Sequence, residues 1–214
     1  MQPGSDDEAT TETRDSYDVI ARRYRTLKRQ RGSGDYLAEL LDRFVAGVPT
    51  HGRVLDLGCG HGLEVQELVD RGLQAAGLDL SRGMLECACE VAAGRLVQAD
   101  MRSLPFAATS LDGVWSVHAL LHIPPDDLAD VISDIRRVPR PGGSVAVSFA
   151  GGDGVHREEV AYYAGRYRTF VHRSLETMIK MMGRAGLIVD SAGRAPEAER
   201  DTVWIVAHRS SEVP

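Results

Sequence analysis

A run of glycines and two acidic residues carry the clearest chemistry in this sequence. The run VLDLGCGHG, residues 54–62, places Asp56 ahead of Gly58, Gly60 and Gly62. Closely spaced glycines permit positive φ and let a backbone approach a ligand. A carboxylate buried at a strand end is costly without a partner, and a ligand carrying an ammonium group would supply one. Asp79 stands at the end of the next apolar run, one expected strand later.

Apolar runs alternate with amphipathic stretches from residue 53 onward, which predicts an α/β fold with a mostly parallel sheet covered on both faces. The loop 191–201 joins the last two strands without a helix, so that pair is expected to be antiparallel. The expected strands are 53–57, 73–80, 95–98, 112–117, 143–149, 187–190 and 202–208. The expected helices are 17–31 with Asp15 as N-cap, 36–48, 62–71 ending at Gly72, a helix capped by Ser81, 124–138 and 174–185.

The spacing of the glycines argues against a dinucleotide site. The dinucleotide pattern G-x-G-x-x-G needs a glycine where this chain has Leu63, and Gly62 comes too early. The run instead resembles the first motif of the class I S-adenosylmethionine-dependent methyltransferases, an acid followed by Gly-x-Gly-x-Gly. Five further segments follow the same family in order across roughly residues 17–209: YDVIARRY at 17–24, GLDLS at 77–81, QADMRSLPF at 98–106, LDGVWSVHALLHI at 111–123 and RRVPRPGGSVAVS at 136–148.

This resemblance implies a Rossmann-like, doubly wound seven-stranded sheet in the order 3-2-1-4-5-7-6, with strand 7 antiparallel. It implies S-adenosylmethionine as cofactor, S-adenosylhomocysteine as product, and no need for a metal. Asp79 would take the ribose, Asp100 would face the adenine amino group, Met101 would lie beside the ring, and Arg31 is the candidate for the ligand's carboxylate. The remaining expected cofactor residues are Tyr17, Asp56, Gly58, Cys59, Gly60, Leu80, Met84, Ser116 and Val117.

Candidate catalytic residues stand after the fourth expected strand and on the first expected helix. His118 and His122 could each act as a base near neutral pH, and Tyr24 shares a helix face with Tyr17. Packing offers an alternative for all four: His118 beside the ligand, His122 orienting the loop before Pro124, and the tyrosines holding the helix down. Residues 150–173, rich in Tyr, Arg and His, form either an acceptor-side insertion or an ordinary surface loop.

The bulk composition predicts one domain. The chain has 214 residues and a net charge of −6, which disfavours nucleic-acid binding. Residues 1–16 read as a disordered leader, 17–209 as a single methyltransferase domain with capping helices at 17–48, and 210–214 as a tail. The three cysteines fit free thiols, and no apolar run is long enough for a membrane span, so we expect a cytoplasmic monomer or homodimer.

The expected function is methylation of a small molecule, with O-, N- and C-methylation all open and secondary metabolism as one setting. Three alternatives remain. A tRNA wobble-uridine-type methyltransferase would use the basic run 22–31, against the negative net charge. The other two are a non-catalytic S-adenosylmethionine-binding protein and a nucleotide-dependent oxidoreductase.

Overall fold

The computed structural model describes residues 6–31, 35–195 and 201–211, apart from the side chain of Arg31. Its strands are β1 (Arg53–Leu57), β2 (Gln74–Asp79), β3 (Leu96–Gln98), β4 (Leu111–Val117), β5 (Pro139–Ala150), β6 (Gly154–Glu159), β7 (Tyr167–His172), β8 (Leu187–Ala195) and β9 (Thr202–Arg209). Its helices are α1 (Asp6–Arg31), α2 (Asp35–Ala46), α3 (Leu63–Asp70), α4 (Arg82–Ala92), α5 (Leu128–Arg137), α6 (Leu175–Arg184) and the short 3₁₀ helix η1 (Leu120–His122).

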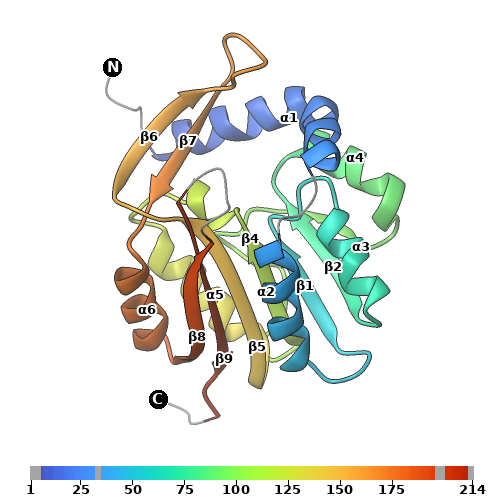
Figure 1. The fold of residues 1–214 in the computed structure, drawn as a ribbon, viewed down its shortest axis with the longest axis vertical. Helices are drawn as coiled ribbons and strands as arrows, with labels where there is room; N and C mark the ends of the chain where they lie inside the picture. Colours follow the sequence, from blue (N-terminus) through green and yellow to red (C-terminus); the bar gives the residue numbers. More distant parts are fainter. Residues whose placement is uncertain (1–5, 32–34, 196–200, 212–214) are drawn as a thin grey trace.

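Seven strands form one sheet in the order β3-β2-β1-β4-β5-β9-β8 (Figure 1). The first five pair in parallel, whereas β9 runs antiparallel to both β5 and β8. Because β8 and β9 are the sixth and seventh strands of this sheet along the chain, the expected order and the antiparallel seventh strand are both confirmed. The expected antiparallel pairing of the last two strands is confirmed as well.

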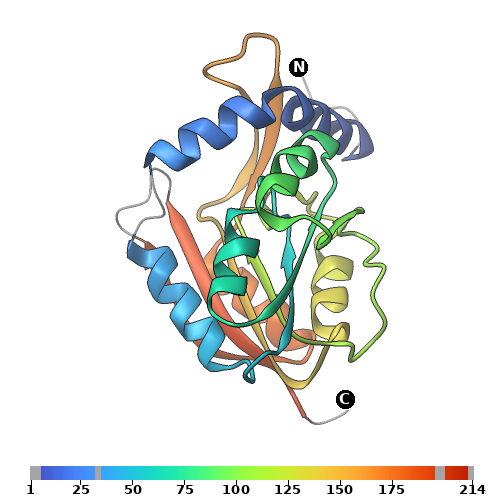
Figure 2. The ribbon, with the colours of Figure 1, turned by 90° about the vertical axis from the view of Figure 1, so that its right-hand side faces the viewer.

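Helices cover both faces of the sheet (Figure 2). On one face, α5 and α6 pack against Val114, Val145 and Val147. On the other, α2, α3 and α4 pack around Val54 and the fully buried Trp115. Apolar side chains on both faces explain why the strands show no polar alternation. The carboxyl ends of the parallel strands therefore meet at one edge, where a ligand can be reached.

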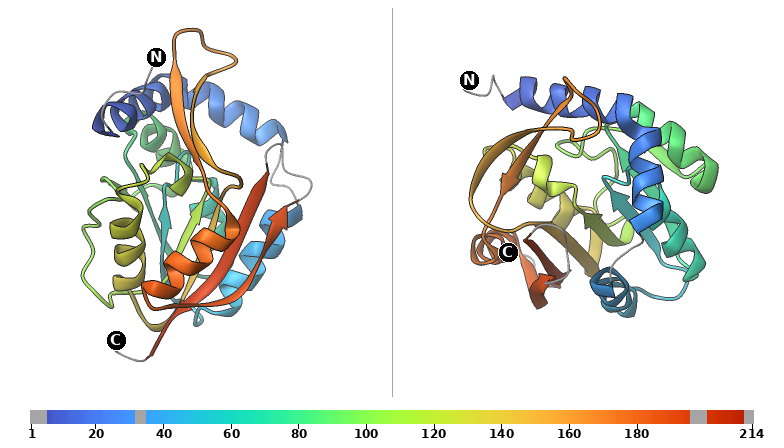
Figure 3. Two further views of the ribbon diagram at one scale, coloured as in Figure 1. Left: turned by 90° about the vertical axis from the view of Figure 1, so that its left-hand side faces the viewer. Right: turned by 45° about the horizontal axis from the view of Figure 1, so that its top comes forward.

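Helix α1 crosses above that edge and begins far earlier than expected (Figure 3). Residues 6–16, expected to be disordered, form its first half, and Asp15 lies inside the helix instead of capping it. Tertiary contacts outweigh the polar composition here. Thr13 and Ser16 are buried against β7. The Thr13 hydroxyl accepts from Thr169 N–H at 3.0 Å, and the Ser16 hydroxyl donates to the Tyr167 carbonyl and accepts from Tyr167 N–H.

The centre of α1 is fixed to the start of α4. Asp18 Oδ1 accepts from the Ser81 hydroxyl at 2.6 Å and from Gly83 N–H at 2.8 Å. A Cβ on Gly83 would lie 2.4 Å from the Asp18 carbonyl oxygen, so only glycine allows this approach. Ser81 also accepts from Met84 N–H and so caps α4, as the sequence predicts.

The segment expected as an irregular insertion, 150–173, contains a regular two-stranded antiparallel sheet, β6–β7. The hairpin leaves the main sheet after β5 and rises beside α1 (Figure 3). Phe170 and Val171 bury one side of it. Helix α1 lies above the carboxyl ends of the strands, and β7 packs against it.

Candidate active site

A cavity of about 160 Å³ opens at the carboxyl ends of β1, β2 and β4, under α1. Fourteen of the residues expected in the site line it: Tyr17, Tyr24, Asp56, Gly58, Cys59, Gly60, Asp79, Leu80, Met84, Asp100, Met101, Val117, His118 and His122. Ser116 does not. Its side chain is fully buried inside the sheet, where the hydroxyl donates to the Leu57 carbonyl at 2.9 Å. Arg31, expected to hold a carboxylate, has its side chain outside the described residues.

The turn after β1 is built from glycines with positive φ. Gly58, Gly60 and Gly62 have φ of 79°, 50° and 80°. Gly58 N–H and Cys59 N–H both donate to the Leu78 carbonyl, which ties the turn to β2. A Cβ on Gly58 would lie 2.2 Å from the Ala119 Cβ, whereas one on Gly60 would meet nothing within 4 Å and would stand at the cavity wall. The two glycines therefore serve different purposes, packing at Gly58 and room for a ligand at Gly60.

Alanine substitutions should separate these purposes. Gly58→Ala combines left-handed strain with overpacking and is expected to lower the free energy of unfolding by about 2–5 kcal/mol. Gly60→Ala should cost only about 1–2 kcal/mol, yet weaken ligand binding at least tenfold, because its methyl group occupies open cavity space. Urea unfolding and titration with S-adenosylhomocysteine measure the two effects. Equal losses of stability in both variants would contradict this division.

Asp79 is held in place before any ligand arrives. Its Oδ2 accepts from Gly60 N–H at 2.8 Å and its Oδ1 accepts from Ser81 N–H at 2.8 Å. Burial raises the pKa of this carboxyl, and the backbone donors partly offset that rise. One bond on each oxygen fixes the plane of the carboxylate and leaves a lone pair on each for a further donor.

Asp56 has an unsatisfied oxygen. The residue is 2% exposed, and its Oδ2 is buried without a hydrogen-bond partner. Burial, followed by the nearby Glu64 and Asp79, raises the pKa of this carboxyl well above its ordinary range. Such a group destabilises the free protein unless a cationic donor binds beside it.

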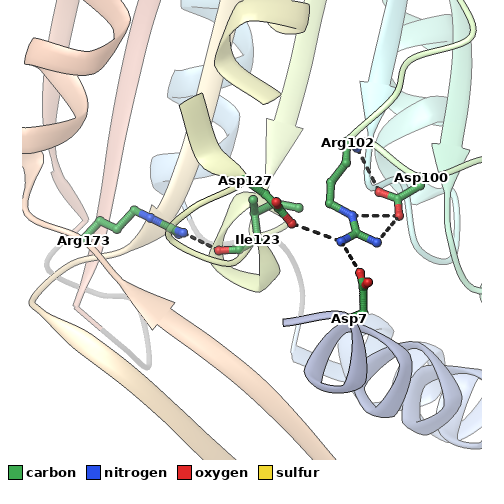
Figure 4. Close-up of polar contacts among 6 residues, drawn as sticks. All are labelled: Asp7, Asp100, Arg102, Ile123, Asp127 and Arg173. Atoms are coloured by element: carbon green, nitrogen blue, oxygen red, sulfur yellow. Dashed lines mark hydrogen bonds and ion pairs between the residues drawn. The ribbon is translucent and has the colours of Figure 1, made fainter. Parts of the chain in front are cut away.

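Asp100 belongs to an arginine-centred cluster at the other end of the cavity (Figure 4). Arg102 donates to Asp100 through Nε at 2.9 Å and Nη2 at 2.8 Å, to Asp127 at 3.0 Å, and to Asp7 of α1 at 2.9 Å. These three carboxylates hold the Arg102 pKa above its usual value. The cluster links the first turn of α1 to the wall of the cavity.

The second arginine in Figure 4 braces the segment after β4. Arg173 is buried and donates to the Leu120 carbonyl at 2.9 Å and to the Ile123 carbonyl. Burial lowers the Arg173 pKa to about 10. Its bonds to Leu120 and Ile123 reach the first residue of η1 and the residue after it, so they hold the element that carries His122.

A directed chain of hydrogen bonds runs from His122 across the cavity wall. Its Nδ1 lies 2.7 Å from the Thr169 carbonyl oxygen, which can only accept, so Nδ1 carries the proton. Nε2 therefore accepts from the Tyr17 hydroxyl at 2.9 Å. Burial raises the Tyr17 pKa to about 12, so this hydroxyl remains protonated at neutral pH. The Tyr17 oxygen in turn accepts from Arg168 Nη1 at 3.3 Å.

His118 makes a separate contact. Its Nε2 lies 2.8 Å from the Tyr36 hydroxyl of α2, and its backbone has φ of 52°. This left-handed conformation is unusual for a residue with a side chain and is typical of functional positions. His118 thus lines the cavity directly after β4, where the sequence places it.

Comparison with known proteins relates the chain to a family and to individual enzymes. Residues 55–147 match the family described as "Methyltransferase domain". The chain is 36% identical over 126 residues to a malonyl-[acyl-carrier protein] O-methyltransferase of Enterobacter lignolyticus (strain SCF1), covering 58% of this chain and 49% of the relative. It is 34% identical over 166 residues to the enzyme of the same name from Pseudescherichia vulneris, covering 74% and 63%.

A solved structure shares the fold over nearly the whole chain. The 1,6-didemethyltoxoflavin-N1-methyltransferase of Burkholderia thailandensis, with bound 1,6-didemethyltoxoflavin and S-adenosylhomocysteine, superposes with a TM-score of 0.76 at 16% identity, covering 99% of this chain and 93% of that one. Residues 55–147 therefore carry a methyltransferase domain, and the chain has the fold of the class I S-adenosylmethionine-dependent methyltransferases. The chain spans 49% and 63% of the length of the two curated relatives.

The methyltransferase also lines its cavity with residues that sequence reasoning missed. Lys28 lies on the same face of α1 as Tyr17 and Tyr24, four residues after Tyr24, a spacing that could have identified it. His61, inside the glycine run, is 5% exposed, and burial together with the cations of α1 lowers its pKa to about 4. The complete set of additional residues is Thr10, Thr13, Arg14, Lys28, His61, Glu64, Ser81, Ala99, Ala119 and Ile123.

The basic run 22–31 of this methyltransferase is not one continuous surface. Arg25 is buried, where it donates to the Cys87 carbonyl and pairs with Glu90, and Lys28 lines the cavity. Arg22, Arg23 and Arg29 are exposed. In the described part of the chain, no helix combines the length and apolar character that a bilayer crossing requires.

Proposed function

We propose that this chain transfers the methyl group of S-adenosylmethionine to a small-molecule acceptor. The observation that carries the proposal is the pair of acids on neighbouring strands: Asp56 with a buried, unpartnered oxygen, and Asp79 held by two backbone donors. S-Adenosylmethionine has an ammonium group that suits the first and a ribose diol that suits the second. The open space at Gly60 supports the same ligand.

The other residues of the cavity are assigned by their chemistry. Asp100 and Met101 would hold the adenine, with Arg102 fixing the Asp100 carboxylate. Lys28 and Arg14 are the cations of α1 that line the cavity. Arg14 pairs with Asp15, so we assign to Lys28 the carboxylate-binding role first expected of Arg31. Glu64 stands near Lys28, which offsets part of the rise in the Glu64 pKa caused by burial.

When bound, S-adenosylmethionine supplies a methyl carbon made electrophilic by a positively charged sulfur. The chain's own residues align the acceptor with that carbon and exclude water, which α1 does by covering the cavity. His122 already uses both ring nitrogens, so we assign to it the orientation of Tyr17. His118, directly after β4, is the candidate base for acceptors that must lose a proton. Burial raises the Tyr24 pKa, so this hydroxyl serves as a donor.

Turnover tests the proposal. The protein should convert S-adenosylmethionine to S-adenosylhomocysteine when it is supplied with a panel of carboxylic acids, phenols, amines and acyl thioesters. Mass spectrometry then identifies the methylated product. The malonyl-[acyl-carrier protein] O-methyltransferases among its relatives make malonyl thioesters the first members of that panel. Tight S-adenosylhomocysteine binding without turnover of any acceptor would favour a binding protein instead.

A further inference from the structure

Arg168 of β7 is half-buried next to Tyr17, a residue that lines the cavity, and contacts two aromatic rings. Its guanidinium carbon is 5.4 Å from the centre of the Tyr17 ring and 5.1 Å from that of Phe170. Nη1 donates to the Tyr17 hydroxyl at 3.3 Å, so the arginine touches a residue that lines the cavity. The rings and this bond hold the planar group in one orientation.

The charge of Arg168 is not neutralised by an ion pair within the described residues. The neighbouring Arg157 of β6 pairs with Glu12 of α1, whereas no ion pair joins Arg168 to a carboxylate of the described residues. The Nε of Arg168 is buried without a hydrogen-bond partner. Glu158 stands opposite Arg168 in the register of β6 and β7, and from α1 the Tyr17 hydroxyl contacts Arg168. The guanidinium can therefore still pair with an anionic group of a ligand.

When the His122 imidazole is neutral, the hydrogen-bond chain runs in one direction, from Arg168 to the Thr169 carbonyl. Thr169 C=O accepts from His122, His122 accepts from Tyr17, and Tyr17 accepts from Arg168. Each acceptor in this series is thus served by the next residue, and the last donor is the Arg168 guanidinium, which has unused N–H groups. These residues therefore present hydrogen-bond donors, and no basic nitrogen, to an incoming molecule.

We propose that Arg168, oriented by the chain Tyr17–His122–Thr169, binds a carboxylate of the methyl acceptor. This inference rests on the proposed function and deepens it by naming the chemical class of the acceptor. A planar guanidinium matches the two oxygens of a carboxylate, and its partial burial between two rings strengthens the interaction relative to an exposed site. Arg168 is then a specificity-determining residue, and His122 is a positioning residue that acts through Tyr17.

Malonate and its neutral isostere malonamide provide matched probes. In the protein saturated with S-adenosylhomocysteine, isothermal titration should show malonate binding at least tenfold more tightly than malonamide. Arg168→Gln should remove this preference, and Arg168→Lys should restore part of it. Arg23→Gln, which makes the same change of charge at an exposed position of α1, should leave malonate binding unchanged.

The affinity for S-adenosylhomocysteine itself separates this inference from the proposed function. If Arg168→Gln binds S-adenosylhomocysteine normally and malonate poorly, both stand. Equal affinities for malonate and malonamide, no malonate binding to the wild type, or unchanged malonate binding in Arg168→Gln would each overturn the role of Arg168. Failure of the wild type to bind S-adenosylhomocysteine would instead overturn the proposed function.

Discussion

Replacing Asp79 by alanine is expected to abolish binding of S-adenosylhomocysteine. The carboxylate would accept two hydroxyls of the ribose, and each hydrogen bond to a charged group contributes about 1.5–3 kcal/mol. Losing both weakens binding by more than about 100-fold. The same change removes the acceptor of Gly60 N–H and Ser81 N–H, so the glycine turn also loses its fixed geometry. Isothermal titration of the ligand measures the loss.

Asp112→Ala is the matched control. Asp112 also accepts a backbone bond, from Arg53 N–H at 2.7 Å, and pairs with Arg140, but it stands at the start of β4, away from the cavity. It should reduce stability without changing ligand affinity. A ligand affinity in Asp79→Ala within threefold of the wild type would mean that the ribose is held elsewhere.

Replacing Asp56 by asparagine is expected to change the stability of the free protein and its ligand affinity in opposite directions. The asparagine removes a buried charge that lacks a partner, so the free protein should gain about 1–3 kcal/mol at pH 8. The ligand loses its partner for the ammonium group, so its affinity should fall at least tenfold. Loss of both stability and affinity would show instead that the carboxylate has a structural partner.

The pH dependence of the free energy of unfolding tests whether the Asp56 carboxylate causes this loss of stability. Its pKa in the folded protein is raised above the ordinary value of 3.8. At a pH between the ordinary pKa and the raised pKa, the folded state binds more protons than the unfolded state. The free energy of unfolding therefore falls as pH rises from about 4 through the raised pKa. Glu64 and Asp79 also have raised pKa values and act in the same direction. The difference between wild type and Asp56→Asn in urea unfolding at a series of pH values isolates the contribution of Asp56, and it should grow with pH.

The sequence motifs indicated which residues would line one cavity because those residues lie near the ends of consecutive strands. Asp56, Asp79 and Asp100 each stand at or just after the end of an apolar run, and a parallel sheet brings such positions to one edge whatever the details of packing. The strand order of the sheet was available from the family resemblance.

The acceptor side could not be predicted in the same way. Thr13 and Ser16 looked like part of a polar leader because no neighbouring residue in the sequence indicates that their hydroxyls will bond to the backbone of β7. The tautomer of His122 depends on the Thr169 carbonyl, 47 residues away along the chain. The side chain of Ser116 does not line the cavity for a simpler reason: alternate residues of β4 point to opposite sides, and its hydroxyl turns toward β1.

The bonds between α1 and β7 also determine when the cavity can form. Thr13 and Thr169 are 156 residues apart in sequence, and Ser16 and Tyr167 are 151 apart. During synthesis, α1 leaves the ribosome well before β7, because strands β1 to β5 lie between them in sequence. Contacts of such large sequence separation form late because the intervening chain must first be ordered. Helix α1 is therefore among the last elements to dock, and the cavity beneath it closes only near the end of folding.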